Sequence, residues 1–418
     1  MQHRLPLLIV LPFTIAVTTA RLSAENWPEF RGPTANGHAS GDLPLQWSET
    51  KNVRWKIDVH DRGWSSPVVW KDQIWLTTAT RDGKKMYAVC VNKNSGKIEH
   101  DLLLLENKEP RFCHPTNSYA SPTPVVEEGR VYVHFGSYGT FAINSATGET
   151  LWSRKDLPCD HWRGPGSSLM LYDDKLYVPF DGYDLQYMVA FDKTTGKTVW
   201  KKDRNIDYHS DNGDHRKAYC TCIAVEEGGR KQIISPSAYD TISYDPQTGE
   251  ELWRVKHGGM NAASRPVYAD GIVYIVIGDA GPTLYAVKTD GSGDVTDTHV
   301  AWSMKAGGPK RPSPILTNGL LIYVTDDGVA NCVDAKTGKN HWKKRLAGKF
   351  RSSPILANDR VYFFDLDGKS SVVKASREFA LLAENHLESG CQASAAVSGD
   401  ALFVRTVKSL YRIESKNQ

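Results

Sequence analysis

Two groups of polar residues in this 418-residue chain have types and a spacing that could do chemistry. In the first, His209-Ser-Asp-Asn-Gly-Asp-His215 places two imidazoles beside two carboxylates, Asp211 and Asp214. Such a set can surround a cation, but its spacing matches no standard metal-binding motif. We therefore weigh a metal site formed by these four residues against a solvated loop, and the spacing favours the loop.

The second group is cationic. Arg311 and Arg351 each stand three residues before a proline, so they occupy the same place in a repeated unit. Their guanidinium groups can hold a carboxylate or a phosphate through two parallel hydrogen bonds. The alternative, which we favour, is that they pair with carboxylates of the chain itself, for which the candidates are Asp326, Asp365 and Asp367.

Further reactive side chains lie in the segments between the repeated strands, and such loops carry function when a rigid scaffold positions them. Trp64 takes the place of the two arginines in the first repeat, where its ring is either a stacking floor or ordinary packing. The candidate ligand-binding residues are Trp64, His114, Trp162, Arg163, Arg265, Arg311, Arg351 and Asp367. No Gly-x-Ser-x-Gly, phosphate-binding loop or His-Glu-x-x-His motif occurs, so no catalytic residue is assigned.

The element that must position these residues is a repeated hairpin. Residues 190–200 alternate along one strand, turn at Thr195-Gly196, and return to Trp200. This pattern predicts two strands joined by a turn in which glycine accepts a positive φ. Copies of the hairpin occupy residues 142–152, 243–253 and 332–342. A spacing of about 40–50 residues between copies is typical of propellers and solenoids.

Each full unit contains four expected strands, and the first of them often begins at a proline. The units start near residues 65, 122, 167, 219, 264, 312, 352 and 393, which makes eight. Residues 52–414 divided by eight give about 45 residues, the size of a four-stranded blade. The last unit has only three strands of its own, and residues 52–59 supply the fourth. We predict an all-β, eight-bladed propeller whose closing blade combines both ends of the chain, which removes free sheet edges.

Composition and charge exclude several classes of function. The chain is 40% hydrophobic and 24% charged with a formal net charge of +3, so it is globular and has no strong field for nucleic acid or anionic lipid. Residues 1–24 have a basic start and a short apolar run, as in a cleaved secretory signal. We expect an exported protein, periplasmic or secreted, without a lipid-acceptor cysteine or a transmembrane segment. After the signal come an extended segment (25–51), the propeller (52–414) and a tail (415–418).

The seven cysteines are an odd number for an exported chain, and their pairing stays open. Cys220 and Cys222 face the same side of one strand, where bridging is rare. Cys113 and Cys159 are weighed as a bridge between neighbouring repeats, against two free thiols.

The repeated unit Ala-x-Asp-x-x-Thr-Gly-x-x-x-Trp resembles the tryptophan-docking motif of the pyrroloquinoline-quinone (PQQ) propeller family. Residues 190–200 match it at every position, and the resemblance covers roughly residues 52–414. It implies that each tryptophan packs between adjacent blades while the Thr-Gly turn shapes the hairpin. The residues that match these docking positions are Trp152, Trp200, Trp253, Trp302, Trp342, Gly148, Gly196, Gly249 and Gly338.

Two branches of that family lead to different expectations. Quinone-dependent alcohol dehydrogenases are longer and use adjacent cysteines beside the quinone, a tryptophan floor, a calcium site of Glu and Asn, and an Asp base. This chain has no adjacent cysteines, and its calcium ligands and base cannot be assigned by motif. The other branch is non-catalytic and similar to BamB, the propeller lipoprotein of outer-membrane barrel assembly, which has about this length.

These observations favour an exported binding or scaffolding propeller that holds a partner protein or a small ligand at its loop-rich face. We expect it to be a monomer. Nucleic acid is not expected as a partner, and no cofactor is assigned. The alternative is an alcohol or sugar dehydrogenase that depends on PQQ and calcium. A weaker alternative is a carbohydrate-binding propeller, suggested by Trp64, Trp162 and the Asp-rich loops.

Overall fold

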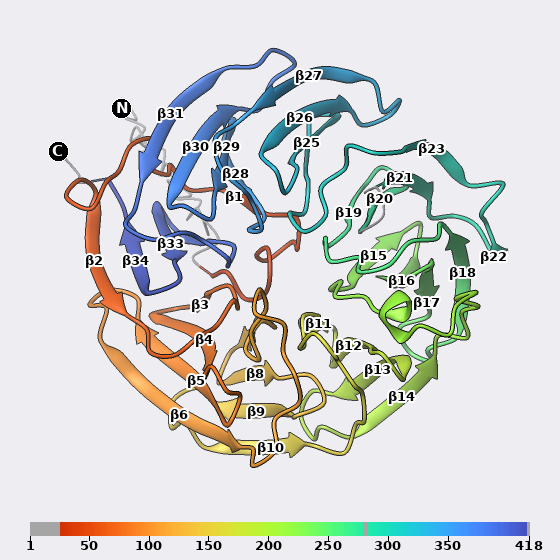
Figure 1. Ribbon diagram of the computed structural model, residues 1–418, viewed down its shortest axis with the longest axis horizontal. Helices are drawn as coiled ribbons and strands as arrows, with labels where there is room; N and C mark the ends of the chain where they lie inside the picture. Colours follow the sequence, from red (N-terminus) through yellow and green to blue (C-terminus); the bar gives the residue numbers. More distant parts are fainter. Residues whose placement is uncertain (1–25, 279–282, 416–418) are drawn as a thin grey trace, which may run out of the picture.

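The computed structural model describes residues 26–278 and 283–415, which form eight β-sheets around a central axis (Figure 1). Four strands of each sheet lie side by side in an antiparallel blade that runs from the axis to the rim. The fold is therefore the all-β, eight-bladed propeller that the repeats predict. The expected signal peptide, residues 1–24, lies outside the described residues.

The first four blades follow one another along the chain. Blade 1 contains β3 (Val68–Trp70), β4 (Gln73–Ala79), β5 (Lys85–Asn92) and β6 (Ile98–Glu106). Blade 2 contains β7 (Val125–Glu127), β8 (Arg130–His134), β9 (Thr140–Asn144) and β10 (Thr150–Arg154). Blade 3 contains β11 (Met170–Tyr172), β12 (Lys175–Asp181), β13 (Gln186–Asp192) and β14 (Thr198–Asp203). After the 3₁₀ turn Gly213–Arg216, blade 4 contains β15 (Ile223–Glu227), β16 (Arg230–Pro236), β17 (Asp240–Tyr244) and β18 (Glu251–Lys256).

The second half repeats this order, with two additions. Blade 5 contains β19 (Val267–Ala269), β20 (Ile272–Ile277), β21 (Thr283–Lys288) and β23 (Val300–Met304), and its inserted β22 (Gly293–Asp294) joins blade 4 beside β18. Blade 6 contains β24 (Ile315–Thr317), β25 (Leu320–Val324), β26 (Val329–Asp334) and β27 (Asn340–Arg345). Blade 7 contains β28 (Ile355–Ala357), β29 (Arg360–Phe364), β30 (Lys369–Lys374) and β31 (Leu381–His386), with β1 (His38–Ala39) beside β28. Blade 8 contains β32 (Ala396–Ser398), β33 (Ala401–Arg405), β34 (Ser409–Ile413) and β2 (Val53–Asp58).

The position of a strand within its blade explains its sequence. Middle strands such as β12 are buried along their whole length because neighbouring blades cover both faces. Outer strands such as β2 alternate between half-buried and exposed residues, the pattern of a strand with one face in solvent. Inner strands such as β7, which has three residues, are the strands of each blade nearest the axis. The loops that precede them therefore also lie close to the axis.

The repeated tryptophans and glycines fasten several neighbouring blades to each other. The indole nitrogen of Trp152 in blade 2 donates to the carbonyl of Lys193 in blade 3 at 3.1 Å. A Cβ on Gly196, which has a φ of +70°, would lie 2.6 Å from the Trp152 ring, so the turn needs glycine for both reasons. Equivalent bonds are made by Trp55, Trp200, Trp302 and Trp342.

Two docking positions depart from this pattern. Blade 5 carries an insertion instead of the Thr-Gly turn, and Trp253 bonds to Gln232 Oε1 within its own blade at 2.7 Å. Gly148 packs against Leu102, because the outer strand of blade 1 has no tryptophan.

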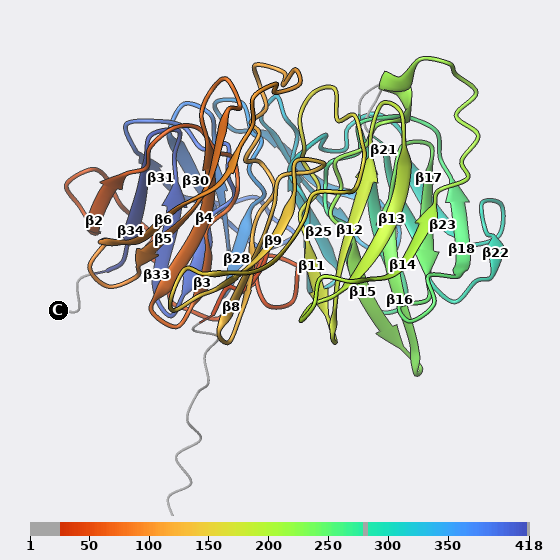
Figure 2. The same ribbon diagram turned by 90° about the horizontal axis from the view of Figure 1, so that it is seen from below.

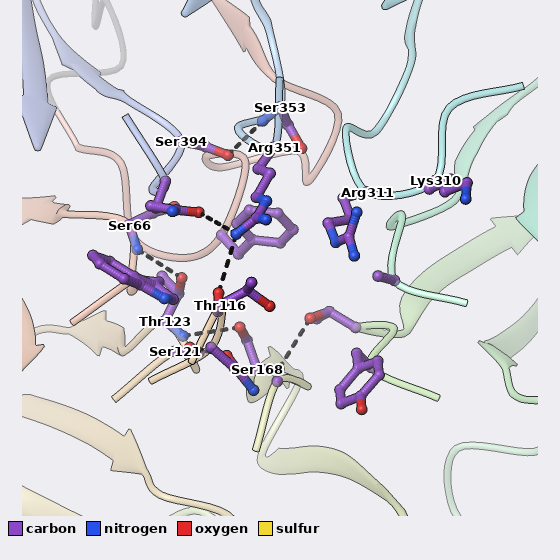
Figure 3. A pocket seen from close by; sticks show the side chains of 18 of the residues that line it. Ser66, Thr116, Ser121, Thr123, Ser168, Lys310, Arg311, Arg351, Ser353 and Ser394 are labelled. Atoms are coloured by element: carbon purple, nitrogen blue, oxygen red, sulfur yellow. Dashed lines mark hydrogen bonds between the residues drawn. The ribbon is translucent and has the colours of Figure 1, made fainter. Parts of the chain in front are cut away.

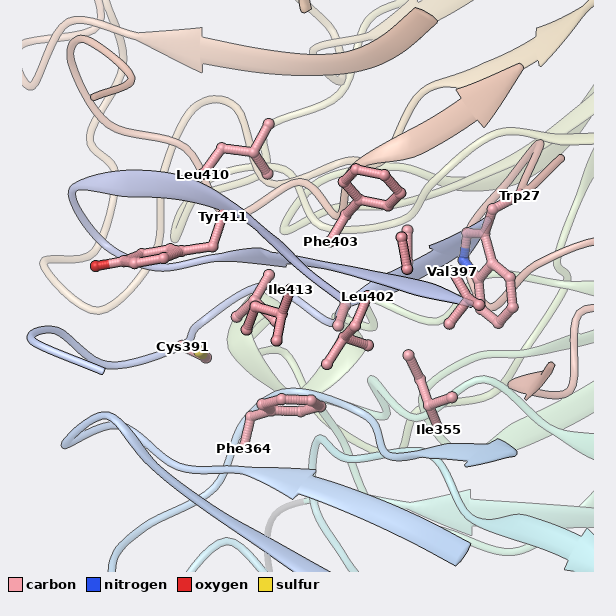
Figure 4. Packing of buried hydrophobic residues seen from close by; sticks show 14 of the residues in the cluster. Trp27, Ile355, Phe364, Cys391, Val397, Leu402, Phe403, Leu410, Tyr411 and Ile413 are labelled. Carbon is pink, nitrogen blue, oxygen red and sulfur yellow. The ribbon is translucent and has the colours of Figure 1, made fainter. Parts of the chain in front are cut away.

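The ring closes as the sequence predicts. Strand β2 pairs antiparallel with β34, with Lys56 opposite Tyr411 and Ile57 opposite Leu410. Apolar side chains of blade 8 pack between blades 1 and 7 in one continuous cluster, and Figure 4 shows Leu402, Phe403 and Ile413 at its centre.

Residues 26–40, here called the crossing segment, run through the middle of the ring at one end of the channel (Figure 1). Trp27 exchanges two backbone hydrogen bonds of 2.8 Å with Val69 of blade 1, and Pro28 accepts one from Val126 of blade 2. Arg31 donates to the carbonyls of Ser313 and Pro314 in blade 6, and β1 pairs with blade 7. The crossing segment thus ties together inner strands from opposite sides of the ring.

All seven cysteines are free thiols in the structure, so Cys113 and Cys159 are not bridged. Among the described residues, no helix is long and apolar enough to cross a membrane.

Candidate functional site

A pocket of about 360 Å³ lies on the propeller axis, at the end of the channel opposite the turns that follow the inner strands. The loops that lead into the inner strands and the long loops between second and third strands rise on this face (Figure 2). Loops from all eight blades line the pocket, and Phe30 of the crossing segment closes its base. We call this cavity the axial pocket.

A ring of hydroxyl groups, the hydroxyl belt, surrounds the lower part of the axial pocket. It consists of the residue that stands two places before each inner strand: Ser66, Thr123, Ser168, Thr221, Ser313, Ser353 and Ser394. Hydrogen bonds link the belt residue of one blade to that of the next. The backbone N–H of Ser66 donates to Thr123 Oγ1 at 3.0 Å, and that of Thr123 donates to Ser168 Oγ at 2.9 Å. Four further bonds of 2.8–3.0 Å continue the pattern.

The belt leaves its hydroxyl hydrogens available. Six of the seven oxygens accept from a backbone N–H, while their own O–H groups can rotate toward another acceptor: those of Thr123, Ser168, Thr221, Ser313, Ser353 and Ser394. Among the hydrogen bonds of the described residues, the six belt hydroxyls that line the pocket donate to no protein group. The lower pocket is therefore a ring of donors.

Arg265 takes the hydroxyl position in blade 5 and has a different role. Its side chain is completely buried and contacts the crossing segment: it donates to the carbonyl of Phe30 and forms an ion pair of 3.1 Å with Glu29. Burial raises the pKa of Glu29, and the neighbouring Arg265 opposes that rise. Arg265 therefore holds the crossing segment rather than a ligand at the loop-rich face, which differs from its expected place.

Cationic side chains surround the upper part of the pocket, where Arg351 and Arg311 extend toward its middle (Figure 3). Arg311 pairs with Asp326, as the favoured alternative predicts. Arg351 instead donates to the carbonyl of Thr116 and to Gln392 Oε1, both at 3.1 Å. In the described part of the chain Arg351 has no ion-pair partner, so its charge is not neutralised by a carboxylate.

The charged side chains that line the described part of the pocket are all basic. Arg163, Lys310, Arg311 and Arg351 line it together with His114, and no Asp or Glu is among the described lining residues. Burial and the surrounding arginines lower the pKa of His114, and burial together with Arg311 lowers the pKa of Arg351. The neighbouring arginines thus disfavour additional positive charge in the pocket, and burial disfavours the charged form of both groups.

The expected ligand-binding residues fall into two sets. Trp64, His114, Arg163, Arg311 and Arg351 meet in the axial pocket. Trp162 lies outside it on the exposed rim, Arg265 is buried at its base, and Asp367 belongs to a loop of blade 7 that does not line it.

The proposed metal ligands are not brought together. His209 lies beside Asp207, His215 contacts the hydroxyl of Ser210, and Asp214 pairs with Arg163. Within residues 26–278 and 283–415, no group of three or more His, Cys, Asp or Glu side chains is placed to hold a metal ion. The loop therefore serves to hold Arg163 at the pocket.

Sequence reasoning missed the hydroxyl belt, Tyr219 and Gln392. The signal for the belt was present, because Ser or Thr stands directly before the proline of several inner strands, as in Ser66-Pro67 and Thr123-Pro124. The proline predicts the start of a strand, whereas nothing in the local sequence assigns a role to the hydroxyl residue before it.

The ring of eight blades, with a tryptophan of one blade docked on the glycine turn of the next, defines the class of PQQ-like β-propellers. Residues 46–217, 238–330 and 292–408 match the family described as outer membrane protein assembly factor BamB. Since these ranges cover well over half of the chain, the protein belongs to this family.

Relatives of named activity are similar over only part of this chain. Quinoprotein ethanol dehydrogenase of Pseudomonas putida is 30% identical over 148 residues, which are 31% of this chain and 22% of that protein. Tetrathionate hydrolase of Acidithiobacillus ferrooxidans is 25% identical over 236 residues, 54% of this chain and 45% of that protein. The chain thus spans about a fifth to a half of the lengths of these relatives.

Solved structures share the fold at low identity. BamB from Moraxella catarrhalis superposes with a TM-score of 0.61 at 12% identity, covering 86% of this chain and 99% of that one. A europium-containing methanol dehydrogenase superposes with a TM-score of 0.68 at 11% identity, covering 92% and 90%. Both similarities concern the architecture alone.

The axial pocket does not fit a calcium–quinone dehydrogenase centre. Its cations and hydroxyl groups can hold the acid groups of a quinone, but among the described residues it offers no carboxylate as a calcium ligand or base. Cys220 and Cys222 are buried away from it, and burial raises the pKa of the Cys222 thiol to about 12.

Proposed function

We propose that this protein is an exported binding propeller whose axial pocket holds a small organic anion. The observation that carries the proposal is the one-sided chemistry of the pocket: cationic side chains above, hydroxyl donors below, and no carboxylate among the described lining residues. A ligand with a carboxylate, sulfate or phosphate group would receive hydrogen bonds from both levels.

Arg351 is the central residue of this proposal. Its present partners are a carbonyl and an amide oxygen, which are weaker partners than a carboxylate. An anion in the pocket would therefore gain a charge-assisted bond without first breaking an ion pair. Arg311 and Arg163 would contribute less, because Asp326 and Asp214 already pair with them.

Binding to simple anions tests the proposal. Isothermal titration with sulfate, phosphate, citrate and PQQ should show one site per chain. Arg351→Gln should weaken binding about tenfold to a hundredfold, since one charge-assisted bond is worth about 1.5–3 kcal/mol. Arg351→Lys should lose less, because the charge remains while the planar fork is lost. Arg54→Gln on outer strand β2 is the matched control and should bind like the parent. Equal affinity in Arg351→Gln, or no binding of any anion, would contradict the proposal.

Quinone-dependent oxidation is a second candidate, favoured by the relationship to quinoprotein dehydrogenases over 148 residues. It is tested by adding PQQ and calcium and following dye reduction with alcohols and sugars. Our proposal predicts that PQQ binds as an anion without turnover. Turnover that depends on both PQQ and calcium would favour the enzyme instead.

A further inference from the structure

Three exposed aromatic side chains gather beside the axial pocket. Phe112, Trp162 and Tyr183 are 52%, 44% and 38% exposed, and in the described part of the chain no other Phe, Tyr or Trp side chain is as exposed. The ring centres of Phe112 and Trp162 are 5.5 Å apart, and those of Trp162 and Tyr183 are 5.6 Å apart. We call this group the aromatic rim, and such an exposed apolar patch marks an interaction site.

The backbone at Trp162 is held in an unfavourable conformation. Its φ is +50°, a region that bulky residues rarely adopt and that costs about 1–3 kcal/mol when the surroundings impose it. The imposed contacts are visible: the N–H of Trp162 donates to Asp160 Oδ1 at 2.8 Å, and Lys217 donates to the carbonyl of His161. A glycine or asparagine would adopt this conformation at lower cost, yet the position carries a large ring turned toward solvent.

The aromatic rim and the axial pocket form one continuous surface. Arg163 follows Trp162 directly and lines the pocket. The Phe112 ring lies 6.4 Å from the ring of His114, which also lines the pocket. A ligand can therefore place an anionic group at Arg351 and extend across His114 and Arg163 to the rim.

We infer that the ligand is an acidic saccharide, a uronate or sulfated sugar, with its acid group in the axial pocket and a neighbouring sugar ring on the aromatic rim. This inference rests on the proposed function. Sugar rings present C–H faces that pack on aromatic side chains, and their hydroxyls suit the amides and hydroxyls of Thr116, Asn117 and Gln392. The Trp162 ring is inclined by 52° to the ring of Phe112 and by 46° to that of Tyr183, which gives separate platforms rather than the long groove that a peptide helix needs.

The test compares saccharides that differ in charge and length. Affinities are measured by titration for sulfate, galacturonate, tri-galacturonate, a sulfated trisaccharide, neutral maltotriose and a hexapeptide of Asp and Glu. At least one acidic trisaccharide should bind about tenfold or more tightly than galacturonate or sulfate, a gain of about 1.4 kcal/mol. Maltotriose and the peptide should not show this gain.

Variants of Trp162 test whether the gain in trisaccharide affinity comes from the aromatic rim. Trp162→Asn should remove the trisaccharide gain, leave the affinity for sulfate unchanged, and keep or raise the thermal midpoint, because asparagine tolerates the positive φ. Trp162→Phe should keep part of the gain. Leu151→Ala is the matched control, since Leu151 is also 44% exposed but lies on outer strand β10.

The outcomes separate this inference from the proposed function. If sulfate and galacturonate bind but neither acidic trisaccharide gains, or if Trp162→Asn keeps the gain, the saccharide inference is overturned and the anion pocket stands. A gain for maltotriose or for the peptide would equally overturn it. If no anion binds at all, the proposed function fails, and the inference fails with it.

Discussion

At the base of the central channel, Arg265 and Arg31 are almost completely buried and their hydrogen bonds go to the crossing segment and the inner strands. At the mouth, Arg351 is half-buried, and within the described residues it bonds to a carbonyl and an amide oxygen alone. Arginine side chains thus close one end of the channel, whereas at the other end the partners of Arg351 are neutral oxygen atoms. What differs is how completely the protein itself satisfies the guanidinium group.

The largest effect should come from removing the ion pair between Arg265 and Glu29 at the base of the channel. Arg265→Met leaves Glu29 buried without its ion pair, which costs about 3–5 kcal/mol when one partner of a buried pair is removed. The midpoint of urea unfolding should fall strongly, whereas Arg351→Gln should leave it nearly unchanged. Circular dichroism along a urea titration measures both. Similar losses in the two variants would remove the distinction between the two ends.

A middle-sized effect is expected in the hydroxyl belt, which lies between base and mouth. Ser353→Ala leaves the buried N–H of Ser313 without its acceptor, which costs about 1–3 kcal/mol. Anion affinity should fall too, because one donor to the ligand is lost. Ser353→Thr is the control, since threonine already serves the belt at Thr123 and Thr221. An alanine variant with unchanged stability would show that water replaces the hydroxyl.

The smallest effect concerns pH at the mouth. The folded-state pKa of His114 lies below its ordinary value of 6.5. The unfolded chain therefore binds this proton more readily than the folded chain does. As a result, the contribution of His114 to the free energy of unfolding declines as pH falls below 6.5. Anion binding should respond in the opposite direction, because a bound anion favours the protonated ring. Affinity should rise modestly between neutral and mildly acidic pH, and His114→Gln should flatten that rise. A profile identical in both proteins would assign the pH dependence to another group.

Sequence reasoning predicted the fold well because each blade repeats the same local pattern. Period-two alternation, the Thr-Gly turn and the docking tryptophan recur, and the missing strand of the last unit identified β2 as its completion. The insertion before Trp302 did not reveal that β22 adds to the neighbouring blade, because that pairing depends on tertiary contact rather than on the strand's own two residues.

The site was predicted only in part, since its residues come from loops that share no sequence pattern. Arg311 and Arg351 were recognised from their equal distance to a proline, and both line the pocket. Arg265 is expected at the loop-rich face because it lies in a loop between repeated strands, but the crossing segment supplies Glu29 and Phe30 as its partners from more than 230 residues away. No local signal reports such a contact.

The pairing of β2 with β34 has a consequence for biosynthesis. Ser409 donates to Asp58 across 351 positions of sequence, so β2 has no partner strand until residues 409–413 have been synthesised. A chain that stops short of β34 would retain an open sheet edge, which is a target for proteolysis and aggregation. Closure of the last blade therefore depends on synthesis of the chain through β34.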